Sequence, residues 1–165
     1  DAYVGQWSCD SMSGEGTFET SIGASYRGRW ESNVQQGFGA YAAPDGGRYI
    51  GEWSDGQMHG YGEYTWPDGA AYIGQFRENK RTGRGRIRWE SGIVYDGHWL
   101  EDREHGAGTL EFQDGHQTCG EWRRGERVAA LASDVAARVS FQVSGRPQHD
   151  AGHCAERCVN ACSLM

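Results

Sequence analysis

The sequence predicts an all-β protein, an elongated single-layer antiparallel twisted sheet of stacked β-hairpin repeats with a C-terminal helix and tail. The first observation behind this prediction is a fixed period of 23 residues, at which aromatic and glycine residues recur through most of the 165-residue chain. A short fixed period is typical of stacked repeat architectures. The second is composition: glycine is unusually frequent, with 26 residues, whereas only 37% of the residues are apolar.

Each unit opens with a tyrosine, a glycine and a tryptophan at steps of two residues, as in Tyr49, Gly51 and Trp53. Because side chains alternate across a strand, residues two apart lie on the same face. The second half of the unit repeats this spacing in Gly60, Gly62 and the apolar residues that follow. Each unit is therefore expected to form two strands. The tyrosine column contains Tyr3, Tyr26, Tyr49, Tyr72 and Tyr95, and the sixth copy has Thr118.

Short polar pairs separate the predicted strands. Ser32-Asn33 and Asp55-Gly56 lie within units, and Asp68-Gly69 lies between two units. Asparagine, aspartate and glycine are the residues that tight hairpin turns require. These connections are too short for a crossover helix, so the sheet must be antiparallel. About eleven strands at ~4.8 Å spacing give a twisted ribbon on the order of 50 Å long.

The glycine columns have a packing explanation. A ring from one strand lies flat across its neighbour only where the facing residue has no side chain. A phosphate-binding loop is not indicated, because pairs such as Gly60 and Gly62 recur at strand positions and are not followed by Gly-Lys-Ser or Gly-Lys-Thr.

These motifs, Tyr-x-Gly-x-Trp, Gly-x-Gly and Asp-Gly at 23-residue spacing, resemble the MORN repeat. The resemblance covers residues 1–125 as five full repeats and a terminal half-repeat, because the sixth copy lacks its tyrosine and no Gly-x-Gly pair follows Gly125. It implies a non-catalytic scaffold or structural subunit that binds other protein subunits of a larger cytoskeletal, ciliary or organellar complex. It also allows an alternative role, a peripheral membrane adapter that binds anionic phospholipid headgroups.

The resemblance further implies a location in the cytoplasm, at the cytoskeleton, in a cilium or at a membrane, with an organelle complex as the alternative. A ring-lined ribbon offers a long groove, into which a partner can pack. We expect an aromatic partner-binding face made of Tyr26, Trp30, Tyr49, Trp53, Tyr64, Trp66, Tyr72, Phe76, Trp89, Tyr95 and Trp99.

The composition changes after the repeats. In residues 126–143, Val128, Leu131, Val135 and Val139 follow one another at steps of three and four residues, which predicts an amphipathic helix. Open sheet ends and apolar grooves need a cover, so we expect this helix to cap the array, in preference to docking on a partner. The resemblance implies the same arrangement, because in several MORN-like proteins a helix near the array packs into the groove of the sheet.

The tail, residues 144–165, contains a cluster of His153, Cys154, Cys158 and Cys162. Thiolate and imidazole groups suit zinc, but structural zinc sites usually bring ligands from two separated pairs. We therefore favour oxidisable thiols in a solvated or partner-facing tail and expect no metal. Pairing with another chain in an oxidising compartment is the other alternative.

Arg84, Arg86 and Arg88 alternate with the ring-face residues, so they share the opposite face of their strand. Such a stripe suits inositol phosphate headgroups or an acidic protein tail. The alternative, slightly favoured, is cross-strand pairing with carboxylates such as that of Asp96.

Other classes of function are not indicated. A net charge of −7 argues against nucleic-acid binding. No apolar run approaches the roughly 18 residues of a membrane span. We find no catalytic motif and expect neither enzymatic activity nor a cofactor. The chain begins at Asp1 without a methionine, so we expect a processed or trimmed N-terminus.

Overall fold

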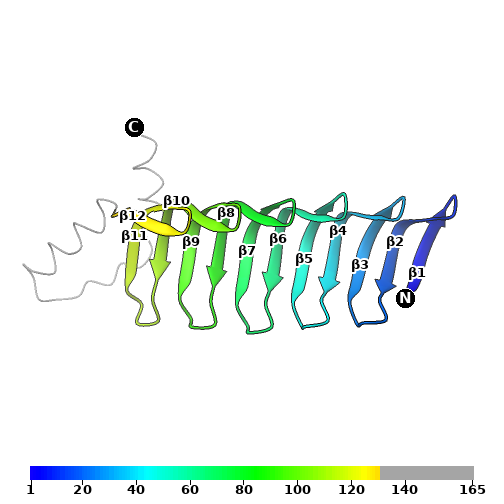
Figure 1. The fold of residues 1–165 in the computed structure, drawn as a ribbon, viewed down its shortest axis with the longest axis horizontal. Coiled ribbons are helices and arrows are strands. Elements are labelled where there is room, and N and C mark those ends of the chain that lie inside the picture. Colours follow the sequence, from blue (N-terminus) through cyan, green and yellow to red (C-terminus); the bar gives the residue numbers. More distant parts are fainter. Residues whose placement is uncertain (131–165) are drawn as a thin grey trace, which may run out of the picture.

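The computed structural model describes residues 1–130, and the predictions for residues 131–165 lie outside them. The described residues form one antiparallel sheet in which twelve strands lie side by side in sequence order, as an elongated row (Figure 1). The strands are β1 (Ala2–Ser8), β2 (Ser11–Glu19), β3 (Ser25–Glu31), β4 (Val34–Ala42), β5 (Arg48–Ser54), β6 (Gln57–Thr65), β7 (Ala71–Arg77), β8 (Lys80–Arg88), β9 (Val94–Leu100), β10 (Arg103–Glu111), β11 (Gln117–Arg123) and β12 (Glu126–Ala130). The predicted all-β antiparallel sheet of hairpin repeats is confirmed, and the predicted C-terminal helix lies outside the described residues from residue 131 onward.

Two kinds of turn join the strands. The two-residue turn within a unit has positive φ at both positions, for example 52° at Asp55 and 74° at Gly56. That conformation matches the strand twist and explains the polar residues found there. The turn between units has one left-handed glycine, such as Gly69 at φ 86°. Three of these turns are capped by an aspartate; for example, the Asp68 carboxylate accepts a hydrogen bond of 2.9 Å from the backbone N–H of Ala70.

The tyrosine rings lie over the glycine backbone, as the sequence predicts. Gly51 and Gly62 pair across β5 and β6, and a Cβ atom at either position would lie 2.5 Å from the Tyr49 hydroxyl oxygen. That hydroxyl donates a hydrogen bond of 2.9 Å to the Glu52 carbonyl, and Tyr49 is fully buried. The pair of glycines therefore forms the floor of a slot that only a flat side chain can fill.

The rings also connect successive repeats. Tyr49 packs edge-to-face against Trp53 of its own repeat, with a centroid distance of 5.2 Å, and against Phe76 of the next repeat, at 5.1 Å. The Trp53 indole N–H donates a hydrogen bond of 3.2 Å to the carbonyl of Gly39 in the preceding repeat. Such ring pairs contribute about 0.5–1.5 kcal/mol each beyond their burial. Each repeat therefore needs its neighbours to complete its core.

The first glycine of each Gly-x-Gly pair has a role that the sequence analysis did not separate. Gly60 has φ 58° and lies at a bulge, where the register between β5 and β6 shifts after Gly51. The Glu52 carboxylate accepts a hydrogen bond of 2.9 Å from the Tyr61 N–H at this bulge. Gly60 supplies left-handed backbone and Gly62 supplies empty space for a ring, so the two columns of glycine have different physical causes.

The C-terminal boundary of the array also differs from the prediction. Residues 126–130, which we expected to begin the helix, form β12, and this strand pairs with β11 through Arg123–Glu126 and Gly120–Ala130. Arg124 and Gly125 make the same left-handed turn as earlier hairpins, so the chain returns as a strand even without the Gly-x-Gly pair. The expected helical residues after Ala130 lie outside the described part of the chain.

The ring-over-glycine packing predicts a specific coupling. Gly62→Ala places a methyl group against the Tyr49 ring, so we expect it to lower the free energy of unfolding by about 1–3 kcal/mol. Most of this cost should vanish in a Tyr49→Thr background, because the smaller side chain leaves room. Urea unfolding of the four variants, followed by tryptophan fluorescence, measures the coupling.

Gly69→Ala is the matched control. No atom lies within 4 Å of the place that its added methyl group would occupy, so its cost comes only from the left-handed backbone. That cost should be equal in both backgrounds. Equal costs of Gly62→Ala in both backgrounds would contradict the proposed contact.

Burial of the tyrosines makes stability depend on alkaline pH. Burial, assisted by the Glu15 carboxylate, raises the pKa of Tyr26 to about 12. Burial likewise raises the pKa of Tyr49, Tyr72 and Tyr95 above the ordinary range. The folded protein thus keeps phenol protons that the unfolded chain releases above pH ~10, and stability falls wherever the unfolded state binds fewer protons.

We therefore expect the tyrosine contribution to be fully present below pH ~9.5 and to be lost progressively from pH ~10 upward. Tyr49→Phe removes one of the titrating groups while keeping the ring, so its free energy of unfolding should decline less steeply over that range. Chemical unfolding at pH 8 to 11.5 measures both slopes. Identical slopes in the two proteins would contradict the assignment.

Candidate interaction faces of the sheet

The structure corrects the prediction for most of the aromatic partner-binding face. Eight of the eleven residues are buried, with exposed fractions of 9% or less, because their rings pack against one another and over glycine. They form the core of the array and are not accessible to a partner. These residues are Tyr26, Trp30, Tyr49, Trp53, Tyr72, Phe76, Tyr95 and Trp99.

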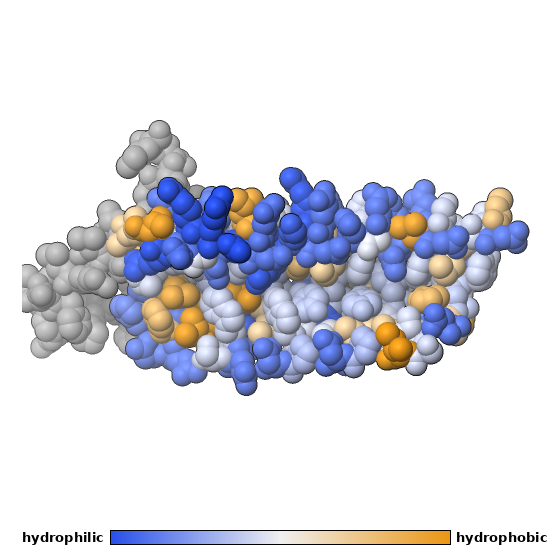
Figure 2. Space-filling model, in the orientation of Figure 1, coloured by the Kyte–Doolittle hydropathy of each residue, from blue (hydrophilic) through white to orange (hydrophobic). Residues whose placement is uncertain are grey.

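The remaining three, Tyr64, Trp66 and Trp89, are partly buried and pack at the margin of this core. Partner binding at these three stays a prediction. Trp66 also packs beside Arg81, whose guanidinium carbon lies 4.4 Å from the Trp99 ring centroid and 5.6 Å from the Trp66 ring. In Figure 2, a band of pale to orange side chains runs along the array beneath a strongly hydrophilic margin.

The Arg81 side chain is held in place by Asp102. Its Nε atom lies 3.2 Å from the Asp102 carboxylate, and this is the only ion pair within residues 1–130. The same carboxylate accepts a hydrogen bond of 2.9 Å from the backbone N–H of Arg81. One repeat earlier, the side-chain oxygen of Asn79 accepts the equivalent hydrogen bond from the backbone N–H of Met58. Arg81 thus replaces a methionine that packs on the rings, and its charge is engaged internally.

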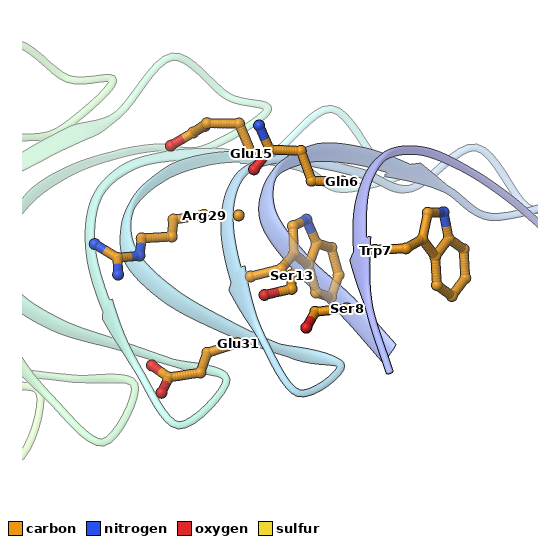
Figure 3. Close-up of a pocket in the computed structure, with 9 residues that line it drawn as sticks. Gln6, Trp7, Ser8, Ser13, Glu15, Arg29 and Glu31 are labelled. Carbon is orange, nitrogen blue, oxygen red and sulfur yellow. The ribbon is translucent and has the colours of Figure 1, made fainter. Parts of the chain in front are cut away.

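An open recess lies at the first repeats, between β1, β2 and β3 (Figure 3). Its lining combines Glu15, Arg29 and Glu31 with small polar side chains and the rings of Trp7 and Trp30. Trp7 is 60% exposed, and its ring stands away from Arg29 and Glu31 in Figure 3. The recess is a shallow surface feature at the end of the sheet where β1 lies.

The reverse face of the sheet, opposite the rings, carries an exposed apolar cluster that we call the reverse-face patch. Its members are Phe38, Ile50, Tyr61 and Ile73, which are 64%, 50%, 57% and 43% exposed. They lie on four consecutive strands, β4 to β7. Exposed apolar side chains that gather on one face mark interaction sites more often than scattered ones do.

Arginines frame this patch on both sides. Arg27 and Arg29 lie on β3, the strand before it, and Arg84, Arg86 and Arg88 lie on β8, the strand after it. All five are exposed. Asp96 is the register partner of Arg86, as the pairing alternative requires, but no ion pair forms between them. The three arginines for which anionic-partner binding was predicted thus lie on one strand, with side chains exposed to solvent.

Two further findings concern the described residues alone. Residues 1–130 contain no group of three or more histidine, cysteine or acidic side chains arranged to hold a metal ion. The cluster of His153, Cys154, Cys158 and Cys162 lies outside these residues. Nor does any helix in this part of the chain have the length and apolar character of a membrane span.

Comparison with known families agrees with the geometry. The family model for the MORN repeat matches residues 3–25, 26–48, 49–71, 72–94, 95–117 and 119–128. The chain belongs to the MORN repeat family. MORN repeats are non-enzymatic modules that are generally associated with interaction with proteins or membrane lipids. A comparison with curated proteins finds no match.

The reverse-face patch of this MORN protein was missed by the sequence analysis. Its signal is present in the repeats, because Ile50 and Ile73 fill the position between tyrosine and glycine, where Arg27 and Asp96 stand in other copies. This position faces solvent in the first five copies, where no buried contact calls for an apolar residue, and it is buried in the sixth, as Cys119. The apolar residues Ile50 and Ile73 at that position are the sequence signal that could have indicated the patch.

Proposed function

We propose that this MORN protein is a non-catalytic scaffold that binds other protein subunits of a larger assembly through the reverse face of its sheet. The observation that carries the proposal is the reverse-face patch. Phe38, Ile50, Tyr61 and Ile73 contribute nothing to the ring core, which lies on the other face. An open, partly apolar sheet face favours protein packing over binding in a deep pocket.

The test is purification of stable partners with the tagged chain. Tyr61→Lys/Ile73→Lys should abolish recovery of a stoichiometric partner, because it removes apolar contact at the centre of the patch and adds charge. Val4→Lys is the control, since Val4 is 77% exposed on the same face, in β1 and away from the patch. Retention of every partner by the double variant, measured by quantitative mass spectrometry, would contradict the proposal.

A second candidate function is binding of anionic phospholipid headgroups. Arg84, Arg86 and Arg88 favour it, because all three are exposed and none belongs to the ion pair found within residues 1–130. Exposed arginine clusters attract anionic membrane surfaces at about 1 kcal/mol per residue.

For this candidate, flotation with vesicles that contain phosphatidylserine and phosphatidylinositol bisphosphate is the measurement. Binding should require the anionic lipids, weaken with added salt and disappear in Arg84→Glu/Arg86→Glu/Arg88→Glu. The circular dichroism of this variant should match that of the parent, and its melting temperature should fall only slightly, because Arg86→Glu places a carboxylate opposite Asp96 on an exposed face. Equal flotation of parent and variant would exclude the three arginines as the lipid site.

A further inference from the structure

We propose that the reverse-face patch binds an amphipathic α-helix of a partner protein, with acidic residues at both ends of the helix. This inference rests on the proposed scaffold function and specifies its partner. The helix would lie along the length of the array, across strands β3 to β8.

The first argument is the arrangement of the apolar residues. Register places Ile50 opposite Ala40 and Ile73 opposite Glu63, in one row across the sheet. Phe38 is opposite Glu52 and Tyr61 is opposite Gln75; as equivalent positions of successive repeats they form the adjacent row, which the bulge between β5 and β6 interrupts. The apolar side chains therefore alternate between two rows from β4 to β7. Successive members are one strand apart along the array, about 4.8 Å.

A helix with a heptad pattern has the same dimensions. Its a and d positions alternate on two sides of one stripe and are separated by about 4.5 and 6 Å along the axis, at 1.5 Å per residue. Two heptads place four apolar side chains over about 15 Å, and the four patch residues span three strand spacings, about 14 Å. One 23-residue repeat, which advances two strands or about 10 Å, thus corresponds to one heptad.

The second argument is charge. Arg27 and Arg29 on β3 lie one strand before Phe38, and Arg84 and Arg86 on β8 lie one strand after Ile73. Acidic side chains one helical turn beyond each end of the apolar stripe would meet these arginines. Arginine pairs with carboxylates through charge-assisted hydrogen bonds, so both ends of the helix would be fixed.

The centre of the patch favours a helix over a lipid surface. Glu63 is exposed and lies in the same row between Ile50 and Ile73, opposite both in register. A carboxylate at this place would repel an anionic membrane at the point of closest approach. A helix accommodates it with a lysine beside the middle of its apolar stripe.

The experiment uses the full chain and a synthetic 20-residue helical peptide labelled with a fluorophore. The peptide carries leucine at the a and d positions of two heptads, glutamates at both ends and one lysine in the middle. A second peptide of equal composition in apolar residues has lysines at its ends. Fluorescence anisotropy at 100 mM salt should show the acidic-ended peptide binding at least ten-fold more tightly.

Arg84→Glu/Arg86→Glu should weaken the acidic-ended peptide at least ten-fold, and a peptide with lysines at one end only should recover binding to this variant. Ile50→Lys should abolish binding of either peptide. Arg124→Glu is the charge control and should change nothing. It keeps the turn, because Glu78 and Glu101 already occupy the equivalent left-handed position, at φ 51° and 47°.

No binding of the acidic-ended peptide, equal binding of the two peptides, or binding unaffected by Ile50→Lys would overturn the proposal. Binding of anionic vesicles that requires the patch, without binding of the peptide, would assign the surface to lipid. If Tyr61→Lys/Ile73→Lys abolishes recovery of a native partner while the acidic-ended peptide fails to bind, the scaffold function stands and the helix assignment fails. If the variant Tyr61→Lys/Ile73→Lys still binds both the native partner and the acidic-ended peptide, the scaffold function of this face and the helix assignment are both contradicted.

Discussion

The stacking of a tyrosine ring over a pair of cross-strand glycines is the interaction on which this sheet depends. A single layer of strands has no second layer against which to bury side chains, so its core must be built on one of its own faces. Tyr49 meets this requirement by lying over Gly51 and Gly62 and donating a hydrogen bond to the Glu52 carbonyl. The neighbouring rings of Trp53 and Phe76 then close over it from both sides.

Because of this packing, the two faces of the sheet have different roles: one face forms the core and the other faces solvent. In β3, β5 and β7 the ring face is nearly constant, whereas the residue beside each tyrosine on the reverse face changes from Arg27 to Ile50 to Ile73. Nothing in the ring core constrains that choice. The reverse face can therefore vary from repeat to repeat at little cost in stability, which is a useful property for a surface that recognises a partner.

The sequence predicted the features that follow from local geometry. Residue spacing indicated the strands, the polar pairs indicated the turns, and the ring-over-glycine packing was expected before the contacts at Gly62 were known. It did not distinguish Gly60 from Gly62, because a glycine needed for left-handed φ and a glycine needed for space look alike in a sequence. Nor did it detect β12, whose residues lack the glycine pair and begin an alanine-rich stretch.

The candidate site was harder to predict, because a face can be assigned from periodicity and its exposure cannot. The aromatic residues were placed on the correct face, but their mutual burial depends on contacts between rings that are about 27 residues apart, such as Tyr26 and Trp53. The reverse-face patch poses the opposite problem. Each member is ordinary in its own repeat, and the cluster exists only when the register brings four strands together.

Register also explains how a simple repeat can encode a specific surface. Each hairpin advances the array by two strands, about 10 Å, which is close to the rise of seven residues in an α-helix. Substitutions at one solvent-facing position in successive repeats therefore fall at intervals that a helix can match. Arg27, Ile50, Ile73 and Asp96 occupy that position in four consecutive repeats. A basic, two apolar and an acidic residue in this order distinguish one stretch of the array from every other, although the ring core beneath them is the same.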